Sequence, residues 1–307
     1  SVSLEGFTHM WQKLNNCGPS ALAMNLSYYG RQDTQFDVAA QIRPHKADRH
    51  VAPFELASYA RSVGFEAVWR VNGDRERLKE LLSNGFPVLV ASWLRIKEND
   101  EVGHYRLVTG YDDAGEYYIT YDSYVHPGVK VRVPYGDFDD LWRIMNRTYL
   151  VLYPPEKADV VTAILGDVLD DRTMYEGALA TAQWEASERP DDAFAWFNLG
   201  SSLYALGRYD EASAAFDKAR TLHLPWRMLW YQPTPLAAYL EAGRYADVLQ
   251  LAEENLRQTE SLEESHYYRG RALEALGRIE EARTAYQAAI EYQPNYSEAK
   301  EALAALQ

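Results

Sequence analysis

The 307-residue sequence predicts an α+β domain over residues 1–154, followed by an all-α repeat domain over residues 155–307. Three observations predict this division. The first half alternates between helical and strand-like hydrophobic spacing, which is typical of α+β folds. The second half repeats a Gly-Arg turn at a period of about 34 residues, which is typical of helical solenoids. Between them, Pro154 and Pro155 cannot donate backbone hydrogen bonds and stiffen the chain, so they mark the boundary.

Within the first domain, the predicted helices come first. Residues 18–29 predict a helix that has Pro19 in its first turn and Gly30 as its stop. Helical spacing recurs near 34–42, 54–63 and 75–83. Strand-like runs follow at 86–93, 103–111, 116–121 and 129–133, and a helix near 135–145 and a strand at 148–153 complete the domain.

The second domain contains Gly-Arg pairs that begin at Gly207, Gly243 and Gly277, with separations of 36 and 34 residues. This pattern resembles the tetratricopeptide repeat, a helix-turn-helix unit. We expect about four repeats that start near 159, 193, 229 and 263, with a cap helix over 296–306. The third repeat departs most, because prolines at 233 and 235 interrupt its first helix.

Packing explains the residue types of these repeats. Small residues let the two helices of a repeat approach closely, and large residues fill the next interface. We therefore expect Trp196, Tyr209, Phe216 and Tyr286 in the core. The concave groove of such an array is a candidate surface for a peptide or protein partner.

Charge is unevenly distributed along the chain. Residues 1–154 carry 17 basic and 19 acidic side chains, whereas residues 155–307 carry 14 and 26. The acidic second half argues against a nucleic-acid partner. It is consistent with a basic peptide or protein partner, or simply with a soluble acidic surface. The sequence has no run of 18 apolar residues, so we expect no membrane span.

Cofactor, metal and compartment signals are weak. The sequence shows no phosphate-binding Gly-rich loop, and we expect no cofactor. His45, Asp48 and His50 form a cluster whose spacing matches no metal-ligand motif, so we expect no metal site, although a role at the rim of a cleft stays open. A single cysteine fits either redox compartment, and a first residue other than Met slightly favours secretion or the cell envelope.

Cys17 is the only cysteine of the chain. It cannot form an internal disulfide, and one thiolate is too few for a thiolate zinc site. A lone cysteine is most often a small buried apolar residue. Cys17, however, stands where a helix is predicted to begin, and the unpaired N–H groups of a helix start favour a thiolate. The position therefore indicates a nucleophile, provided that a histidine lies nearby.

His104 is the best-placed histidine, because it opens the predicted strand 103–111. A turn at residues 112–115 connects this strand to the next one, and a hairpin centred there places His104 opposite Asp122 or Ser123. Asp122 could then orient the imidazole ring for Cys17. A slip of one residue in the register would turn the acid to the other face, and His104 alone would more often be a core or edge residue.

Gln12 precedes the cysteine by five residues, so that its side-chain amide could donate to a developing oxyanion. Gln12-x4-Cys17-Gly18-Pro19, the motif Gly103-His104-Tyr105, and Asp122 together resemble the bacteriocin-processing (double-glycine) cysteine peptidase family. The resemblance covers roughly residues 5–153 and implies a papain-like fold. It implies Cys17 as nucleophile, His104 as general base and acid, Asp122 as orienting acid and Gln12 as oxyanion donor.

Two features depart from that family. The acid is often followed by proline in the family, whereas Ser123 follows here, and repeats stand in place of a transporter domain. We therefore do not expect specificity for a double-glycine leader. The predicted function is a papain-like cysteine peptidase whose repeats recruit a peptide or protein. The alternatives are a catalytically silent peptidase-like domain that binds peptides, and an adaptor that acts through its repeats alone.

Overall fold

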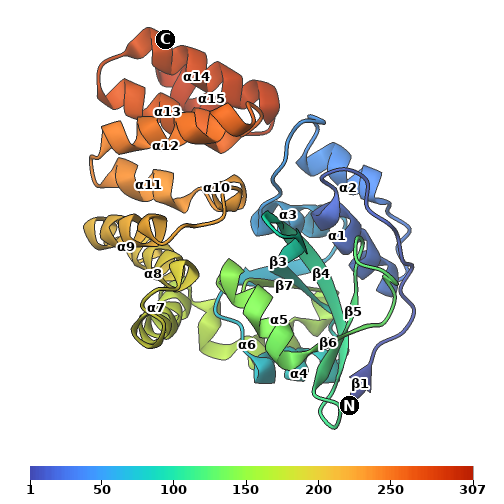
Figure 1. The fold of residues 1–307 in the computed structure, drawn as a ribbon. Coiled ribbons are helices and arrows are strands. Elements are labelled where there is room, and N and C mark those ends of the chain that lie inside the picture. Colours follow the sequence, from blue (N-terminus) through green and yellow to red (C-terminus); the bar gives the residue numbers. More distant parts are fainter. Residues whose placement is uncertain (307) are drawn as a thin grey trace. The chain divides into compact units, whose positions relative to one another are not determined.

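The computed structural model describes residues 1–306, and the chain forms two compact units. The first unit contains Ser1–Ile42 and Val51–Thr181 (Figure 1). The second unit contains Arg43–His50 and the chain from Ala182 onward. An α+β unit followed by helical repeats agrees with the predicted fold class. The domain boundary after residue 154 stays a prediction, because the compact units divide the chain at other positions.

The first unit is built on an antiparallel sheet in the order β2-β7-β3-β4-β5-β6, with β1 paired to β4. The strand β2 was not predicted from the sequence, because it is short and carries charged residues at both ends. Its pairing with β7 places it at one edge of the sheet. The strands are β1 (Val2–Ser3), β2 (Glu66–Arg70), β3 (Val88–Lys97), β4 (Asp100–Asp112), β5 (Tyr117–Tyr121), β6 (Val131–Pro134) and β7 (Tyr149–Tyr153).

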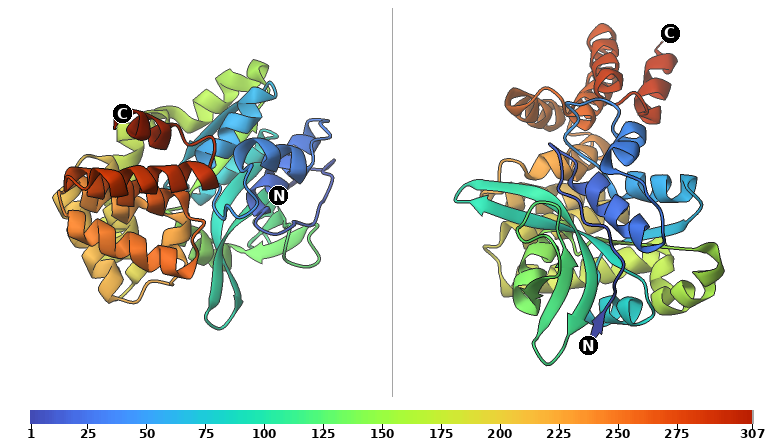
Figure 2. Two further views of the ribbon diagram at one scale, coloured as in Figure 1. Left: turned by 90° about the horizontal axis from the view of Figure 1, so that it is seen from above. Right: turned by 90° about the vertical axis from the view of Figure 1, so that its right-hand side faces the viewer.

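Helices cover both faces of this sheet (Figure 2). On β3, Leu89 and Ala91 pack toward one set of helices, whereas Val88 and Val90 pack toward the other set. Because both faces of β3 are buried, its sequence reads as a continuous apolar run. The helices are α1 (Cys17–Tyr28), α2 (Gln35–Ile42) and α3 (Pro53–Ser62) on the first face, and α4 (Arg75–Ser83), α5 (Tyr135–Trp142) and α6 (Ala158–Leu165) on the second.

The β4–β5 hairpin differs from the predicted hairpin in its register. Its loop is four residues long, 113–116, and a bulge at Thr109 then shifts the pairing back by one residue, so that Leu107 lies opposite Tyr121. Continuing this register places Arg106, not His104, directly opposite Asp122. The predicted direct opposition of His104 and Asp122 is therefore wrong. The two residues are diagonal neighbours on one face, which still lets long side chains meet.

The second unit consists of antiparallel helix pairs that stack on one another (Figure 1). Gly207, Gly243 and Gly277 have φ angles of +74°, +71° and +74°, and each ends the first helix of a pair. This left-handed conformation favours glycine, which explains why the turn recurs in the sequence. The helices are α7 (Asp171–Glu188), which crosses the division between the units, α8 (Ala193–Ala205), α9 (Tyr209–Thr221), α10 (Met228–Tyr231), α11 (Thr234–Glu241), α12 (Tyr245–Gln258), α13 (Glu263–Ala275), α14 (Ile279–Tyr292) and α15 (Ser297–Ala305).

Two glycines explain how closely paired helices approach. A Cβ atom at Gly200 would lie 2.8 Å from the ring of Phe216, and one at Gly270 would lie 2.5 Å from the ring of Tyr286. Both rings are fully buried, as predicted. The other two predicted core residues, Trp196 and Tyr209, are only partly buried, so that part of the prediction is wrong.

The first and third predicted repeats are irregular. In the first, Val161 and Leu165 of α6 pack with Leu78 and Phe86 in the core of the α+β unit. In the third, the expected first helix is divided into the short helices α10 and α11, as the two prolines predict.

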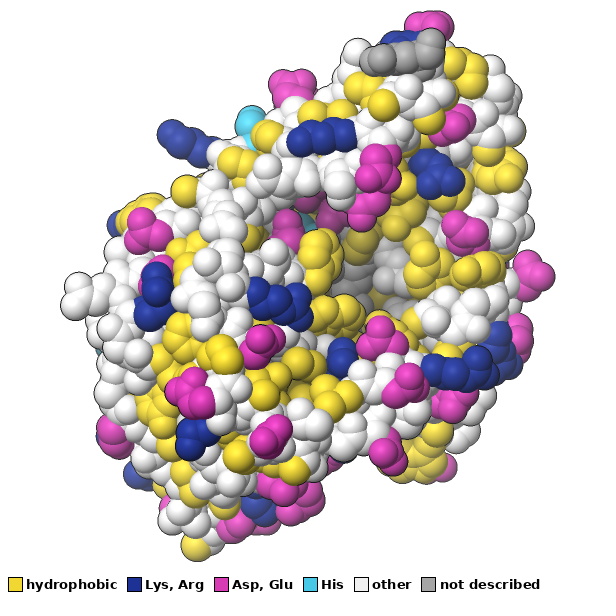
Figure 3. Space-filling model, turned by 180° about the vertical axis from the view of Figure 1, so that it is seen from behind, with side chains coloured by type: hydrophobic (Ala, Val, Ile, Leu, Met, Phe, Trp, Pro, Cys, Tyr) yellow, Lys and Arg dark blue, Asp and Glu magenta, His cyan; other side chains and the backbone are white. Residues whose placement is uncertain are grey.

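The surface carries both signs of charge. On the face shown in Figure 3, acidic side chains are scattered among apolar and basic ones. Among residues 1–306, no helix combines the length and the apolar character needed to cross a lipid bilayer.

Candidate active site

Cys17 is the first residue of α1, so its thiol lies at the helix end where backbone N–H groups are unpaired. The backbone N–H groups of Gly18 and Tyr105 donate to the sulfur, and His104 is hydrogen-bonded to it. The side chain of Cys17 is partly buried and has no disulfide partner. A thiol held by two backbone donors beside an imidazole has the surroundings of a nucleophile rather than of a packing residue.

His104 and Asp122 form a buried pair. The Nε2 atom of His104 lies 3.0 Å from Oδ1 of Asp122, and each side chain is only 2% exposed. His104 lies on β4, and Asp122 directly follows β5, so that the neighbouring strands bring the two residues together. Because Nε2 faces the carboxylate, Nδ1 is the ring nitrogen left for Cys17.

The three groups favour their charged forms. Burial disfavours the thiolate of Cys17, but the hydrogen bond and positive charge of His104 outweigh burial and lower the thiol pKa. Burial also disfavours the imidazolium, yet the Asp122 carboxylate and Cys17 raise the pKa of His104 to about 9. The pKa of Asp122 lies far below its usual range, because the effects of His104 and Arg106 exceed the effect of burial. The arrangement therefore favours a thiolate–imidazolium pair.

Arg106 is a site residue that the sequence analysis missed. Its Nε atom lies 2.9 Å from Oδ2 of Asp122, and its side chain is 8% exposed. The backbone N–H groups of Tyr124 and Val125 donate to Oδ1 of the same carboxylate at 2.8 Å. Asp122 is thus held by four donors, and the hairpin register was the signal that could have identified Arg106.

Gln12 lies beside the residue that follows Asp122. Its backbone N–H donates to the carbonyl oxygen of Ser123 at 2.9 Å, and the Ser123 hydroxyl donates to Oε1 of Gln12 at 2.8 Å. The structure thus brings Cys17, His104 and Asp122 into one contact network and ties Gln12 to the same loop.

Gln35 of α2 holds the segment that leads to the cysteine. Its Oε1 accepts from the backbone N–H of Lys13 at 2.7 Å and from Nδ2 of Asn16 at 3.1 Å, while its Nε2 donates to the carbonyl oxygen of Trp11 at 2.9 Å. Gln35 is 5% exposed. No sequence motif pointed to this residue, because its partners are mostly backbone groups of a loop.

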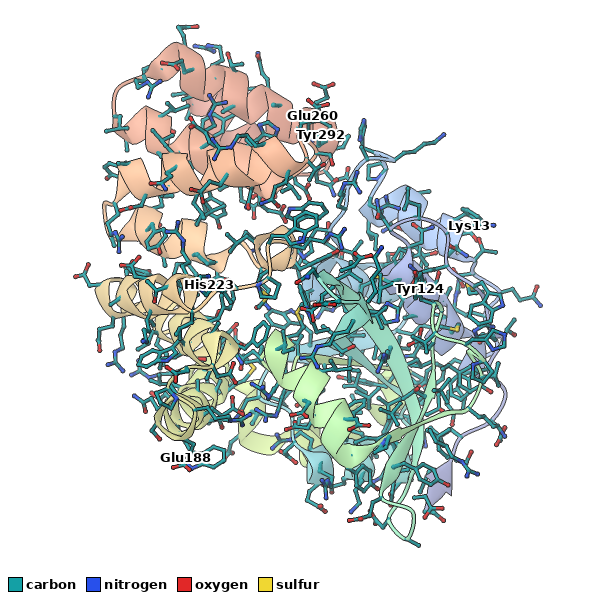
Figure 4. The ribbon with its side chains drawn as sticks, viewed as in Figure 1. Lys13, Tyr124, Glu188, His223, Glu260 and Tyr292 are labelled. Carbon is teal, nitrogen blue, oxygen red and sulfur yellow. The ribbon has the colours of Figure 1, made fainter. Side chains whose placement is uncertain are left out.

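Exposed apolar side chains lie on the segments that carry the site. Trp11 is 46% exposed, Leu14 is 80% exposed and Tyr124 is 49% exposed. The ring of Tyr124 lies 6.5 Å from that of His104. Figure 4 marks Tyr124 on the segment after β5 and Lys13 on the segment before α1. These side chains could contact an extended peptide that reaches the thiol.

The His45, Asp48 and His50 cluster lies in the second unit. Nδ1 of His50 is 2.8 Å from Oε1 of Glu264, and Asp48 accepts from the backbone N–H of His50 at 2.9 Å. These polar groups therefore bond within their own unit. Among residues 1–306, no group of three or more His, Cys, Asp or Glu side chains is arranged to hold a metal ion.

Comparisons with known proteins agree with this architecture. Residues 5–150 match the model of the Peptidase_C39 like family, and residues 193–223 and 263–296 match the tetratricopeptide repeat model. The search of curated proteins gave no significant match.

Similar solved structures fall into two groups. A protein from Bacillus anthracis described as a C39-like peptidase is 18% identical, with coverage of 50% of this chain and 96% of that chain and a TM-score of 0.41. A double glycine motif protease from an AMS/PCAT transporter, solved with its leader peptide, is 22% identical, with coverages of 50% and 94% and a TM-score of 0.38.

The second group contains repeat proteins, such as MamA from Desulfovibrio magneticus RS-1. It is 24% identical, with coverage of 49% of this chain and 84% of that chain and a TM-score of 0.40. The family matches and the two folds agree that this chain carries a Peptidase_C39-like domain followed by tetratricopeptide repeats.

Proposed function

We propose that the first unit is a cysteine peptidase that hydrolyses amide bonds. The observation that carries this proposal is the hydrogen-bonded series from the Cys17 thiol through His104 to the Asp122 carboxylate. A thiolate at a helix start with an oriented imidazole is the arrangement that nucleophilic acyl transfer requires.

In the proposed mechanism, the Cys17 thiolate attacks the carbonyl carbon of the scissile amide, and the carbonyl electrons move to oxygen. Gln12 and the N–H groups at the start of α1 stabilise this oxyanion. His104 then donates its Nδ1 proton to the departing amine, which leaves an acyl-thioester on Cys17. His104 next takes a proton from water, the hydroxide attacks the thioester, and the thiolate leaves.

The second unit has a surface that suits recruitment of a peptide or protein. A cavity of about 660 Å³ lies on α9 and α12 and on the segment that joins α9 to α10. Asp217 and Glu254 line it together with Arg220 and Trp226. The acidic balance of residues 155–307 favours a basic partner.

A catalytically silent, peptide-binding domain is the second candidate. The observation that favours it is the burial of His104 and of its partner Asp122, whose side chains are each 2% exposed. Such a domain would use the exposed Trp11, Leu14 and Tyr124 to grip a peptide without turnover.

Alkylation by iodoacetamide tests the reactive state of Cys17. We expect the rate at pH 6 to exceed that of free cysteine by about a hundredfold, because a free thiol with a pKa of about 8.5 is mostly protonated there. The single cysteine makes the labelled position unambiguous. A rate equal to that of free cysteine over pH 5–9 would contradict the nucleophile assignment.

Turnover of a peptide library, followed by mass spectrometry, separates the two candidates. A peptidase gives cleaved products that disappear in Cys17→Ala. A silent binding domain gives no products, and both the parent and Cys17→Ala retain the same peptides on a column.

Fluorescence anisotropy tests recruitment by the second unit. A labelled lysine-rich peptide should bind more tightly than a glutamate-rich peptide of the same length, and this preference should weaken with salt. Charge reversal at Asp217 and Glu254 should reduce the preference, and equal binding of both peptides would exclude a basic partner.

A further inference from the structure

We infer that Ser123 is a positioning residue that orients the Gln12 side-chain amide toward the oxyanion. This inference rests on the proposed peptidase function and names one further residue of its machinery. Ser123 is 1% exposed and directly follows the orienting acid Asp122. Its hydroxyl and its carbonyl oxygen both bond Gln12 rather than the sulfur or the imidazole, so it acts through Gln12.

Ser123 holds Gln12 by two hydrogen bonds of different kinds. The carbonyl oxygen of Ser123 accepts from the backbone N–H of Gln12 at 2.9 Å, which places the main chain of the glutamine. The Ser123 hydroxyl donates to Oε1 of Gln12 at 2.8 Å, which places the end of the side chain. Any residue at position 123 could make the contact through its backbone carbonyl, whereas the contact to Oε1 needs a side chain with a hydroxyl group.

The hydroxyl contact decides which end of the amide is free to donate. A glutamine amide has an oxygen that only accepts and an NH₂ group that only donates. Because the buried hydroxyl occupies Oε1, the NH₂ group is turned away from Ser123 and keeps its N–H bonds for another acceptor. A flexible side chain with several rotatable bonds is thereby restrained, and the end left free to donate is the end that an oxyanion donor uses.

The segment after β5 is also held by hydrogen bonds that do not involve the Ser123 hydroxyl. Nε2 of His9 lies 2.8 Å from the carbonyl oxygen of Asp122, and the backbone N–H of Asp122 donates to the carbonyl oxygen of Gly128 at 2.8 Å. The Asp122 carboxylate has its own donors, including Arg106. Removal of the Ser123 hydroxyl should therefore release the Gln12 side chain and leave the Cys17–His104–Asp122 contacts in place.

Two probes of Cys17 separate these effects. Iodoacetamide reacts by displacement at carbon: the thiolate forms a C–S bond, iodide leaves, and no oxyanion develops. A peptide aldehyde, N-acetyl-Leu-Leu-norleucinal, accepts the thiolate at its carbonyl carbon to form a hemithioacetal. The C=O electrons move to the oxygen, which takes a proton or a hydrogen bond from the oxyanion donors. Only the affinity for the aldehyde should therefore depend on Gln12 as an oxyanion donor.

The experiment measures both probes in the full chain and in four variants. Ser123→Ala should weaken the aldehyde affinity by about tenfold, as expected for the loss of one orienting hydrogen bond. Gln12→Ala should weaken it by on the order of a hundredfold. The double variant should be no weaker than Gln12→Ala, and Ser123→Thr, which keeps a hydroxyl, should recover most of the affinity. Iodoacetamide rates should agree within about twofold in all five proteins.

Several results would overturn the inference. Unchanged aldehyde affinity in Ser123→Ala would show that the hydroxyl does not orient Gln12. Additive losses in the double variant would show that the two residues act independently. A parallel fall of the iodoacetamide rate in Ser123→Ala would assign the residue a purely structural role. If the full chain itself alkylates no faster than free cysteine, the proposed function fails, and this outcome is distinct from the other three.

Discussion

The two units of this chain differ in the range over which their important contacts are made. In the first unit, Cys17, His104 and Asp122 come from distant parts of the sequence: a bulged hairpin joins His104 to Asp122, and helix α1 carries Cys17. In the second unit, the key contacts are local, such as that between Gly270 and Tyr286 within one helix pair. A repeat can therefore be predicted from a short window of sequence, whereas the candidate site depends on strand pairing and packing across the whole domain.

The two units also differ in the burial of their ion pairs. The Asp122 carboxylate and the Arg106 guanidinium are buried against each other, with side chains 2% and 8% exposed. In the helix pairs, Arg208 bonds Glu211 three residues later, and both side chains are largely exposed. A buried pair is costly to break because it leaves a charge without a partner, whereas an exposed pair contributes little.

The largest effect should come from His104→Ala. Without the imidazolium, the pKa of Cys17 rises toward that of a free thiol, because burial is then opposed only by the backbone N–H groups of Tyr105 and Gly18. Alkylation by iodoacetamide at pH 6 should fall by on the order of a hundredfold or more. His126→Ala is a matched control, since this exposed histidine lies on the segment between β5 and β6 and stacks on Trp11.

The dependence of hydrolysis on pH should report the protonation of His104 in the Cys17–His104 pair. Activity should fall above pH about 9, where His104 loses the proton that the leaving amine needs. Thiolate alkylation needs no such proton, so its rate should persist through this range. A common decline of both rates would place the titration elsewhere than on His104.

Arg106→Met should be the next largest change. It removes one of the two cationic side chains, Arg106 and His104, that pair with the buried Asp122 carboxylate, and we expect a loss of about 3–5 kcal/mol in the free energy of unfolding. Arg208→Met removes one partner of an exposed pair and should cost less than about 1 kcal/mol. Urea unfolding followed by circular dichroism measures both, and equal losses would contradict the contrast between buried and exposed charge.

Gly270→Ala tests the local packing of the second unit. The added methyl group would lie 2.5 Å from the Tyr286 ring, so the helices must separate or the ring must move. We expect a loss of about 1–3 kcal/mol in the free energy of unfolding. Gly136→Ala provides the control, because a Cβ atom there meets nothing within 4 Å. Similar stabilities of the two variants would show that the repeat tolerates a wider helix pair.

The smallest effect concerns Asp48 in the second unit. Burial and the negative charge of Glu264 raise its pKa to about 7, against the opposing effects of the His50 N–H group and Arg43. The protonated carboxyl is thus favoured in the folded state, so stability is present at low pH and is lost as pH rises toward 7. Between pH 6 and pH 7 the loss should be about 1 kcal/mol.

Asp48→Asn removes this titration and serves as the reference. Urea unfolding at both pH values should show a smaller pH dependence in the variant than in the parent. An identical slope in both proteins would mean that Asp48 is already ionised in the folded state at pH 6.

Much of the fold was predictable because it depends on local chemistry. The expected helix over 18–29 is observed as α1, and the Gly-Arg turns, which were found from their repeat period, contain glycines in the left-handed conformation. The prediction failed where a feature depends on pairing partners. The edge strand β2 lacks a local signal, and the loop 113–116, only partly offset by the bulge at Thr109, displaced the register from the predicted one. Arg106 was missed for this reason, since its partner is defined only by the register.

The sequence by itself determined the residue types and their order: one cysteine at a helix start, a histidine and an acid on successive strands, and glycines at the turns of helical repeats. These properties follow from backbone conformation and hydrophobic period, which act over a few residues. Only the tertiary structure decided that Asp122 bonds Arg106 as well as His104, and that Ser123 holds Gln12. Such contacts depend on strand register and buried hydrogen bonds, which arise only when distant segments pack together.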